Sequence, residues 1–113
     1  MQLRDLLSEE EQATVKRMIF FCKERGYKPF ITINPIQIDF RNERIACLAE
    51  SVRRLFEDIV PVLDYSMDNE WSDTSLFECT DCLTQIAGEK FTTVVFNDIT
   101  VSYELSKYKN KFA

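Results

Sequence analysis

Few side chains in this sequence could perform catalysis. None of the 113 residues is histidine, the side chain most used for proton transfer near neutral pH and the commonest metal ligand. The sequence has no glycine-rich loop that could hold a phosphate, and no serine or cysteine has an evident partner base. The carboxylates have neither the spacing of a facing catalytic pair nor the pattern of a calcium loop. We therefore predict a protein that is not an enzyme and has no cofactor.

Four cysteines are the remaining reactive side chains, and two of them form a CxxC motif over residues 79–82. A zinc site of four thiolates would require Cys22 and Cys47, which lie 57 and 32 residues before Cys79, to meet this motif in the core. Acidic neighbours disfavour the thiolate that a redox dithiol needs. The N-terminus has no apolar secretion segment, so we expect reduced thiols, with Cys22, Cys47 and Cys79 packed in the core.

The strongest functional indication is the distribution of charge. Between Leu55 and Glu89 the sequence has nine acidic residues and no lysine or arginine, whereas the remainder has fourteen basic and ten acidic residues. The net charge of −5 therefore combines a strongly negative segment with a positive remainder. Clustered carboxylates attract a positively charged partner and repel nucleic acid and anionic membranes. An acidic surface that serves only solubility is the simpler alternative.

Aromatic residues lie among these acids. Tyr65, Trp71 and Phe77 are amphipathic or apolar side chains with acidic neighbours, and this composition is typical of the centre of a protein interface. The alternative for Trp71 is that it closes the core over a loop. We predict a partner-binding site that comprises Asp64, Asp68, Glu70, Trp71, Asp73, Phe77, Glu78 and Asp81.

The elements that would position these residues begin with a helix over 9–25. Ser8 and Glu11 have the spacing of a capping box, and Gly26 can adopt the left-handed conformation that ends a helix. Apolar residues recur between them at helical intervals. The expected core face comprises Val15, Met18, Ile19 and Cys22.

The next two elements are a strand and a helix. Segment 30–40 alternates apolar and polar residues with a change of phase beside Pro35, which predicts one long bulged strand, with a tight hairpin as the alternative. A regular apolar stripe predicts a second helix over about 45–59, ended by Pro61.

The last part of the chain is predicted to form a third helix and a hairpin. An apolar stripe and a terminal glycine favour a helix over 72–88. Alternating residues over 91–96 and 99–105, joined by Asn97-Asp98, favour a β-hairpin with a two-residue turn. The basic residues 106–113 then form a frayed tail.

This order, α-β-α-α-β-β, predicts an α+β fold with about three helices on one face of a three-stranded, largely antiparallel sheet. A hydrophobic fraction of 45% over residues 1–113 is sufficient for a single domain with one core. No segment has the length and apolarity of a membrane span, and we expect a cytoplasmic protein.

Together these features predict a non-enzymatic inhibitor that uses an acidic surface to cover a basic protein partner. Nucleases and other nucleic-acid-binding proteins have basic surfaces, so an immunity protein, an antitoxin or a phage-type mimic of nucleic acid would fit. One alternative is a homo-oligomeric structural or adaptor subunit that uses Phe20 or an exposed sheet edge. A small thiol- or zinc-dependent protein is the weaker alternative.

Overall fold

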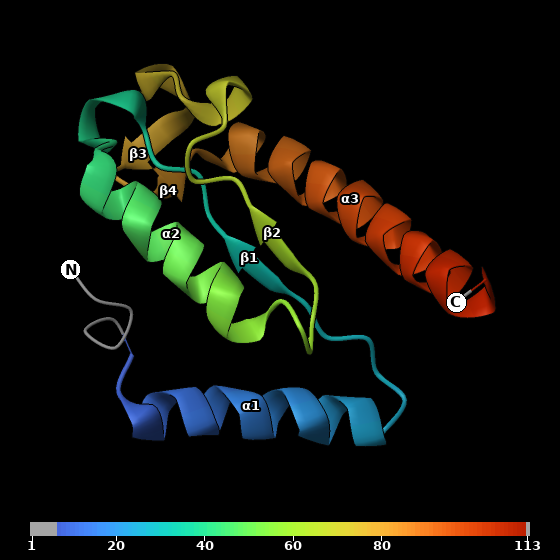
Figure 1. The fold of residues 1–113 in the computed structure, drawn as a ribbon. Helices are drawn as coiled ribbons and strands as arrows, with labels where there is room; N and C mark the ends of the chain where they lie inside the picture. Colours follow the sequence, from blue (N-terminus) through green and yellow to red (C-terminus); the bar gives the residue numbers. More distant parts are fainter. Residues whose placement is uncertain (1–6, 113) are drawn as a thin grey trace.

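The computed structural model describes residues 7–112 and has an α+β architecture with three helices and two small sheets (Figure 1). Each sheet has two strands, so the predicted three-stranded sheet is not formed. In chain order the elements are α1 (Glu9–Glu24), β1 (Ile31–Ile33), η2 (Ile38–Phe40), α2 (Glu43–Phe56), β2 (Val62–Asp64), η3 (Asn69–Trp71), η4 (Thr74–Leu76), β3 (Phe77–Cys79), β4 (Cys82–Leu83) and α3 (Gln85–Phe112), where η denotes a short 3-10 helix.

Helix α1 confirms the local prediction at both ends. The Ser8 hydroxyl accepts the backbone N–H of Glu11 while the Glu11 carboxylate accepts that of Ser8, which is the predicted capping box. Gly26 ends the helical segment with a φ of 80°. Ile19 is buried as expected, but Met18 is 63% exposed, so the core face is narrower than predicted.

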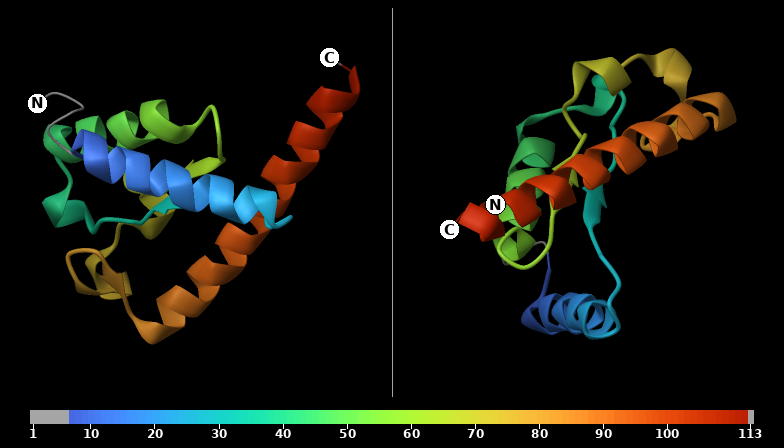
Figure 2. Two further views of the ribbon diagram at one scale, coloured as in Figure 1. Left: turned by 90° about the horizontal axis from the view of Figure 1, so that it is seen from below. Right: turned by 90° about the vertical axis from the view of Figure 1, so that its right-hand side faces the viewer.

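Strands β1 and β2 pair in parallel, and Ile31 lies opposite Val62. Two parallel strands require a crossover, and helix α2 provides it. Helices α2 and α3 lie on opposite sides of this pair, whereas the sequence predicted all helices on one face (Figures 1 and 2). A core apolar cluster is centred on Ile19, Phe56 and Val60, where α1 meets the end of α2.

Segment 30–40 is not one long strand. Pro35 has no N–H for a ladder, and after it the backbone N–H groups of Gln37 and Ile38 donate to the carbonyls of Thr80 and Ser72, at 3.2 and 2.8 Å. These bonds replace strand pairing and hold η2 against the later loop. The chain therefore leaves the sheet at Pro35, which is buried.

Helix α2 matches the second predicted helix, although it is shorter at its C-terminal end. The Asn42 side chain caps it by accepting the backbone N–H of Ile45 at 3.0 Å. The helix ends at Phe56, and a turn over residues 57–59 precedes Pro61. Its apolar stripe faces the sheet and buries Ala49 and Phe56.

The predicted third helix over 72–88 is wrong for most of its length. The carboxylate of Asp73 accepts the backbone N–H of Ser75 at 2.9 Å, which favours the short turn η4. Strands β3 and β4 then pair in antiparallel fashion, with Phe77 opposite Leu83. Gly88 does not end a helix but lies within the first turns of α3.

The predicted hairpin over 91–105 is also wrong, because these residues lie inside helix α3. A hairpin turn at residues 97–98 would need positive φ angles, and no non-glycine residue in the described part of the chain has one. Ala87, Phe91, Val95 and Ile99 recur every four residues and form the face that packs on the sheet. The helix continues through the segment predicted to be a frayed tail and ends at Phe112.

Helix α3 is held to the sheet by an aromatic cluster. The Phe91 ring makes edge contacts with Tyr65 and Trp71, at centroid distances of 4.9 and 5.2 Å. None of the helices in the described region is both long enough and apolar enough to cross a membrane.

Candidate protein-binding face and cysteine hairpin

Four exposed acids of the middle segment, Glu70, Asp73, Glu78 and Asp81, lie on or next to η3, η4 and the β3–β4 hairpin. These elements meet η2 at one end of the molecule (Figures 1 and 2). The N–H groups of Gln37 and Ile38 join η2 to this end through the carbonyls of Thr80 and Ser72. We define the acidic end face by six carboxylates, which are Asp39, Asp68, Glu70, Asp73, Glu78 and Asp81. All of them are exposed except Asp68, which is half-buried.

Two of these acids also shape the backbone that carries the others. Asp68 and Asp73 accept the backbone N–H groups of Glu70 and Ser75, each at 2.9 Å. The hydrogen bond from the Ser75 backbone stabilises the ionised form and lowers the pKa of Asp73 below its usual value. Asp73 therefore stays negatively charged at neutral pH.

A cation next to this face is bonded to backbone carbonyls rather than to the carboxylates. The guanidinium of Arg41 donates to three backbone carbonyls, those of Ile36 and Asp68 at 2.6 Å and that of Trp71 at 3.0 Å. Arg41 thus fixes the loop after β2 to the segment before α2. Its charge is used inside the fold rather than to neutralise the acidic surface.

Ion pairs in the described part of the chain lie elsewhere. Glu50 pairs with Arg53 and Arg54, and Arg53 also lies 4.0 Å from Asp64. Among the side chains that the structure describes, no acid of the acidic end face has a salt bridge. Its carboxylates are therefore available to an external cation.

Asp64 does not belong to this face, although the sequence placed it in the binding site. Its carboxylate accepts the backbone N–H and the hydroxyl of Ser66, at 3.0 and 2.7 Å, and faces Arg53 of α2. Ser66 is completely buried. Asp64 therefore accepts the hydrogen-bond donors of a buried turn at the end of β2.

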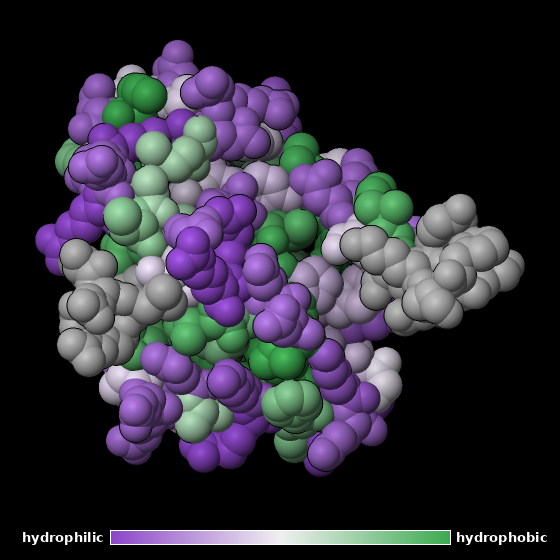
Figure 3. Space-filling model, viewed as in Figure 1, coloured by the Kyte–Doolittle hydropathy of each residue, from purple (hydrophilic) through white to green (hydrophobic). Residues whose placement is uncertain are grey.

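Trp71 and Phe77 are core residues and cannot form the aromatic centre of a contact surface. Trp71 is 5% exposed and packs against Phe91 of α3, and Phe77, the first residue of β3, is 9% exposed. Exposed apolar side chains do lie at this end, but they come from positions that the sequence did not single out, which are Ile38, Phe40 and Met67. Figure 3 shows this end as a largely hydrophilic surface interrupted by small hydrophobic areas.

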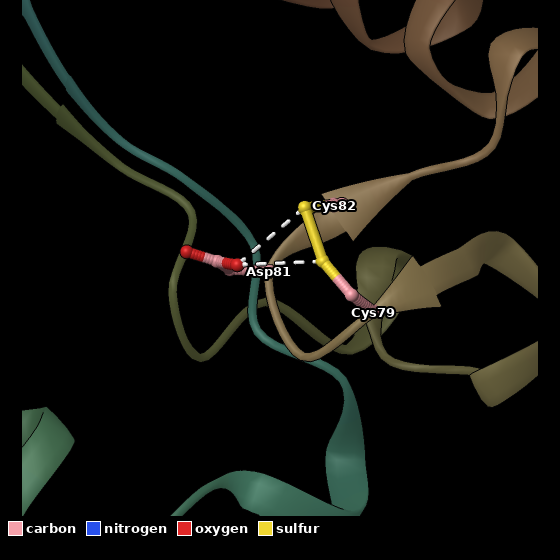
Figure 4. Close-up of side chains that lie close together, drawn as sticks. All are labelled: Cys79, Asp81 and Cys82. Atoms are coloured by element: carbon pink, nitrogen blue, oxygen red, sulfur yellow. Dashed lines mark hydrogen bonds between the residues drawn. A yellow bond between two sulfur atoms is a disulfide. The ribbon is translucent and has the colours of Figure 1, made fainter.

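The CxxC motif forms the tip of the β3–β4 hairpin. Cys79 and Cys82 are joined by a disulfide, and both are exposed (Figure 4). This corrects the prediction of reduced thiols for this pair and of a buried Cys79. Cys22 is a half-buried free thiol, and Cys47 is a free thiol that is exposed rather than packed in the core. The four cysteines therefore do not converge on one site.

The described residues also form hollows outside the acidic end face, of which two lie beside α3. A hollow of about 440 Å³ is lined by Lys23, Asp58 and Tyr103, but the Lys23 ammonium donates to the carbonyl of Ile59 and the Tyr103 hydroxyl to that of Pro29. These bonds give Lys23 and Tyr103 structural roles. A largely apolar groove of about 350 Å³ has Phe30 and Thr32 on one side and five α3 residues on the other, which are Phe91, Thr92, Val95, Phe96 and Ile99.

Comparisons of the chain with protein-family models, with curated proteins and with solved structures found no match. The residues of the acidic end face and of the cysteine hairpin are therefore the basis on which a function is inferred.

Proposed function

We propose that this protein binds the basic surface of another protein through its acidic end face and thereby blocks that surface. The observation that carries the proposal is that none of the six carboxylates has a salt bridge among the described side chains, while the nearby guanidinium of Arg41 is bonded to backbone carbonyls. Uncompensated charge of one sign costs folding free energy through self-repulsion. A positively charged partner would remove that cost.

The exposed apolar residues next to the carboxylates would supply the apolar contact area that contributes to affinity. Ile38, Phe40 and Met67 are 50%, 48% and 44% exposed, and they replace Trp71 and Phe77 as the apolar part of the proposed surface. Interfaces derive much of their affinity from a few buried apolar or aromatic side chains, while surrounding charges set the association rate and the specificity.

A protein surface that binds nucleic acid has the positive charge that complements this face. They carry clustered lysine and arginine residues to neutralise phosphates, and a row of fixed carboxylates can occupy the same cations. We therefore infer a nuclease or another nucleic-acid-binding protein as the partner, and an inhibitory role such as that of an immunity protein, an antitoxin or a phage-type mimic of nucleic acid. Nucleic acid itself would be repelled by the face. Such a role fits a cytoplasmic protein without catalytic activity.

Charge reversal tests this proposal. Asp39, Glu70 and Glu78 are exposed, and their side chains accept no hydrogen bond among the described residues, so replacing all three with lysine should preserve the fold. The matched control replaces Glu24, Glu57 and Glu104, which are exposed elsewhere, with lysine and changes the net charge by the same amount. Binding to a panel of purified basic nucleases and DNA-binding domains is measured by surface plasmon resonance at about 50 and about 200 mM salt.

We expect the wild-type protein and the control to bind a member of the panel with an affinity that falls as salt rises. The face variant should bind at least about tenfold more weakly, with a smaller dependence on salt. Bound nuclease should lose activity, and nucleic acid should compete for it. Equal affinity of the two triple variants, or no binding to any basic protein, would contradict the proposal.

The apolar groove supports a second candidate, self-association as a structural or adaptor subunit. Beside the groove, α3 exposes Phe96, Val101 and Leu105, which are 69%, 57% and 57% exposed, and an apolar surface of this kind is typical of a contact between proteins. The predicted contact residue Phe20 is 45% exposed on α1. Sedimentation of wild type and of Phe96→Asp at micromolar concentrations separates this candidate from a monomeric inhibitor.

A further inference from the structure

The acidic end face does not explain the tip of the β3–β4 hairpin, where three potential metal ligands come together. The Sγ atoms of Cys79 and Cys82 and a carboxylate oxygen of Asp81 lie within 4.8 Å of one another (Figure 4). We propose that, when its disulfide is reduced, this hairpin binds one thiophilic divalent cation of the zinc class through Cys79, Asp81 and Cys82. The disulfide is then the form of the loop that excludes the ion.

The position of Asp81 fits such a site. Its Oδ1 atom lies 3.7 Å from the sulfur atoms of both Cys79 and Cys82. In the sequence Asp81 lies between these two cysteines. In a tetrahedral zinc site with metal–sulfur distances of about 2.3 Å and metal–oxygen distances of about 2.0 to 2.2 Å, neighbouring ligand atoms are roughly 3.5 to 3.8 Å apart. The carboxylate therefore already has the separation from each sulfur that a shared ion requires, and only the two sulfurs must move apart.

Hydrogen bonds that do not involve the sulfurs hold the loop in place. The Gln37 side-chain amide donates to the carbonyl of Cys79, and the Gln37 backbone N–H donates to that of Thr80, each at 3.2 Å. At the base of the hairpin the Thr84 N–H donates to the carbonyl of Leu76 at 2.9 Å. Because these bonds survive cleavage of the disulfide, the reduced loop should keep its three ligands close together, which lowers the entropy cost of binding.

Charge and ligand type select the kind of ion. Two thiolates and a carboxylate at this separation repel one another, and a divalent cation is the group that removes the repulsion. Thiolates are soft ligands, so the set favours zinc and related ions over magnesium or calcium. Both cysteines and Asp81 are exposed, and water can complete the coordination.

Reduction of the disulfide precedes binding of the metal ion. A thiol reductant of the glutathione class supplies two electrons and two protons: the Cys79–Cys82 bond breaks, both sulfurs become thiols, and two reductant molecules leave joined by a disulfide. The ion then displaces the two thiol protons and forms two metal–sulfur bonds and one metal–oxygen bond. Binding therefore releases two protons, and oxidation releases the ion.

The test uses the full chain reduced with a phosphine, with Co²⁺ as the spectroscopic probe and Zn²⁺ as the competitor. We expect thiolate-to-cobalt charge-transfer absorption that saturates at one ion per chain, is displaced by zinc, and is absent from the oxidised protein. Asp81→Asn should weaken binding by about tenfold or more. The Cys22→Ser/Cys47→Ser variant should bind like wild type, whereas the Cys79→Ser/Cys82→Ser variant should show no thiolate absorption.

Several outcomes would overturn the proposal. They are failure of the reduced wild type to bind either ion at about 100 μM, unchanged binding by the Cys79→Ser/Cys82→Ser variant, loss of binding in the Cys22→Ser/Cys47→Ser control, and unchanged affinity of Asp81→Asn. A ratio of one ion to two chains would also overturn it, because two dithiols would then share the ion. Fluorescence of the single buried Trp71 and circular dichroism establish that each variant is folded, and Asp81→Asn keeps the test valid if the double serine variant is not.

Discussion

The hydroxyl of Tyr65 donates a 2.6 Å hydrogen bond to the carboxylate of Asp98, 33 positions further along the chain. Tyr65 follows β2 and is 6% exposed, while Asp98 lies in the middle of α3 on an exposed turn. The bond therefore attaches the long helix to the sheet at the residue that was expected to form a hairpin turn. The hydrogen bond and the edge contact between the Tyr65 and Phe91 rings both attach α3 to the sheet.

Removing either partner of this bond should destabilise the fold by different amounts. Tyr65→Phe leaves an exposed carboxylate that water can solvate, so we expect a loss of about 1 kcal/mol in the free energy of unfolding. Asp98→Ala leaves a buried hydroxyl without its acceptor, and the loss should be larger, about 2 kcal/mol. Urea unfolding followed by Trp71 fluorescence measures both. Equal stability of all three proteins would show that the bond does not dock the helix.

Alkaline pH should weaken the protein through the same tyrosine. Burial, and then the hydrogen bond and charge of Asp98, raise the pKa of Tyr65 above its ordinary value of 10.0, and burial also raises that of Tyr103. Above pH 10.0 the unfolded chain releases protons that the folded chain keeps. The contribution of Tyr65 to stability is therefore full below this pH and falls above it by about 1.4 kcal/mol per pH unit.

The measurement for this pH dependence is the unfolding free energy of wild type and Tyr65→Phe between about pH 8 and about pH 11. The variant should be less stable at neutral pH but should show a shallower fall at high pH, so the two curves should converge. Parallel curves would mean that Tyr65 does not contribute to the alkaline loss.

Arg41 should contribute more to stability than any exposed arginine, because its guanidinium satisfies three backbone carbonyls. We expect Arg41→Ala to cost about 2 to 4 kcal/mol, and Arg41→Lys to recover only part of that loss, since an ammonium cannot span the three acceptors. Arg44→Ala is the control, because Arg44 is exposed at the start of α2. Thermal and urea unfolding should separate the variants, and comparable effects at both positions would refute this role.

The sequence predicted elements whose signals are local. Ser8, Glu11 and Gly26 define α1 through contacts within a few residues, and the stripe of α2 ends in a turn before Pro61. The sequence failed where tertiary contacts decide the backbone, as in the segment over 85–105. Its many β-branched residues favour a strand locally, while the four-residue spacing of the residues that pack on the sheet favours the helix that is observed.

The candidate site was likewise predictable only where its signal is local. Charge is read directly from the residues, and the predicted acids Glu70, Asp73, Glu78 and Asp81 are exposed in the structure. Asp64 is exposed too, but its carboxylate bonds to Ser66 and lies outside the acidic end face. Exposure of a single ring depends on the direction of a 3-10 turn, which no periodicity describes, and this is why Trp71 and Phe77 were misplaced. Pairing of Cys79 with Cys82 depends on a short hairpin that the helical pattern concealed.

The two glycines provide a matched pair of predictions with opposite signs. Gly26 has a φ of 80°, so Gly26→Ala should cost about 1 kcal/mol even though open space surrounds the position. Gly88 lies within α3, and an added methyl group meets no atom within 4 Å, so Gly88→Ala should add about 0.5 to 1 kcal/mol. Melting temperatures should therefore move in opposite directions, and a shared direction would contradict the assigned backbone at one of the glycines.

Asn97 distinguishes helix α3 from the hairpin that the local pattern favours. It is exposed, and in a helix interior Asn97→Ala should raise the free energy of unfolding by about 0.5 kcal/mol, because alanine has the higher helix propensity. In a two-residue hairpin turn the same change would destabilise the protein, since alanine disfavours a positive φ. Thr93→Ala on the exposed side of α3 should act in the same direction as Asn97→Ala. A lower melting temperature for both variants, together with reduced helical circular dichroism, would favour the hairpin over α3.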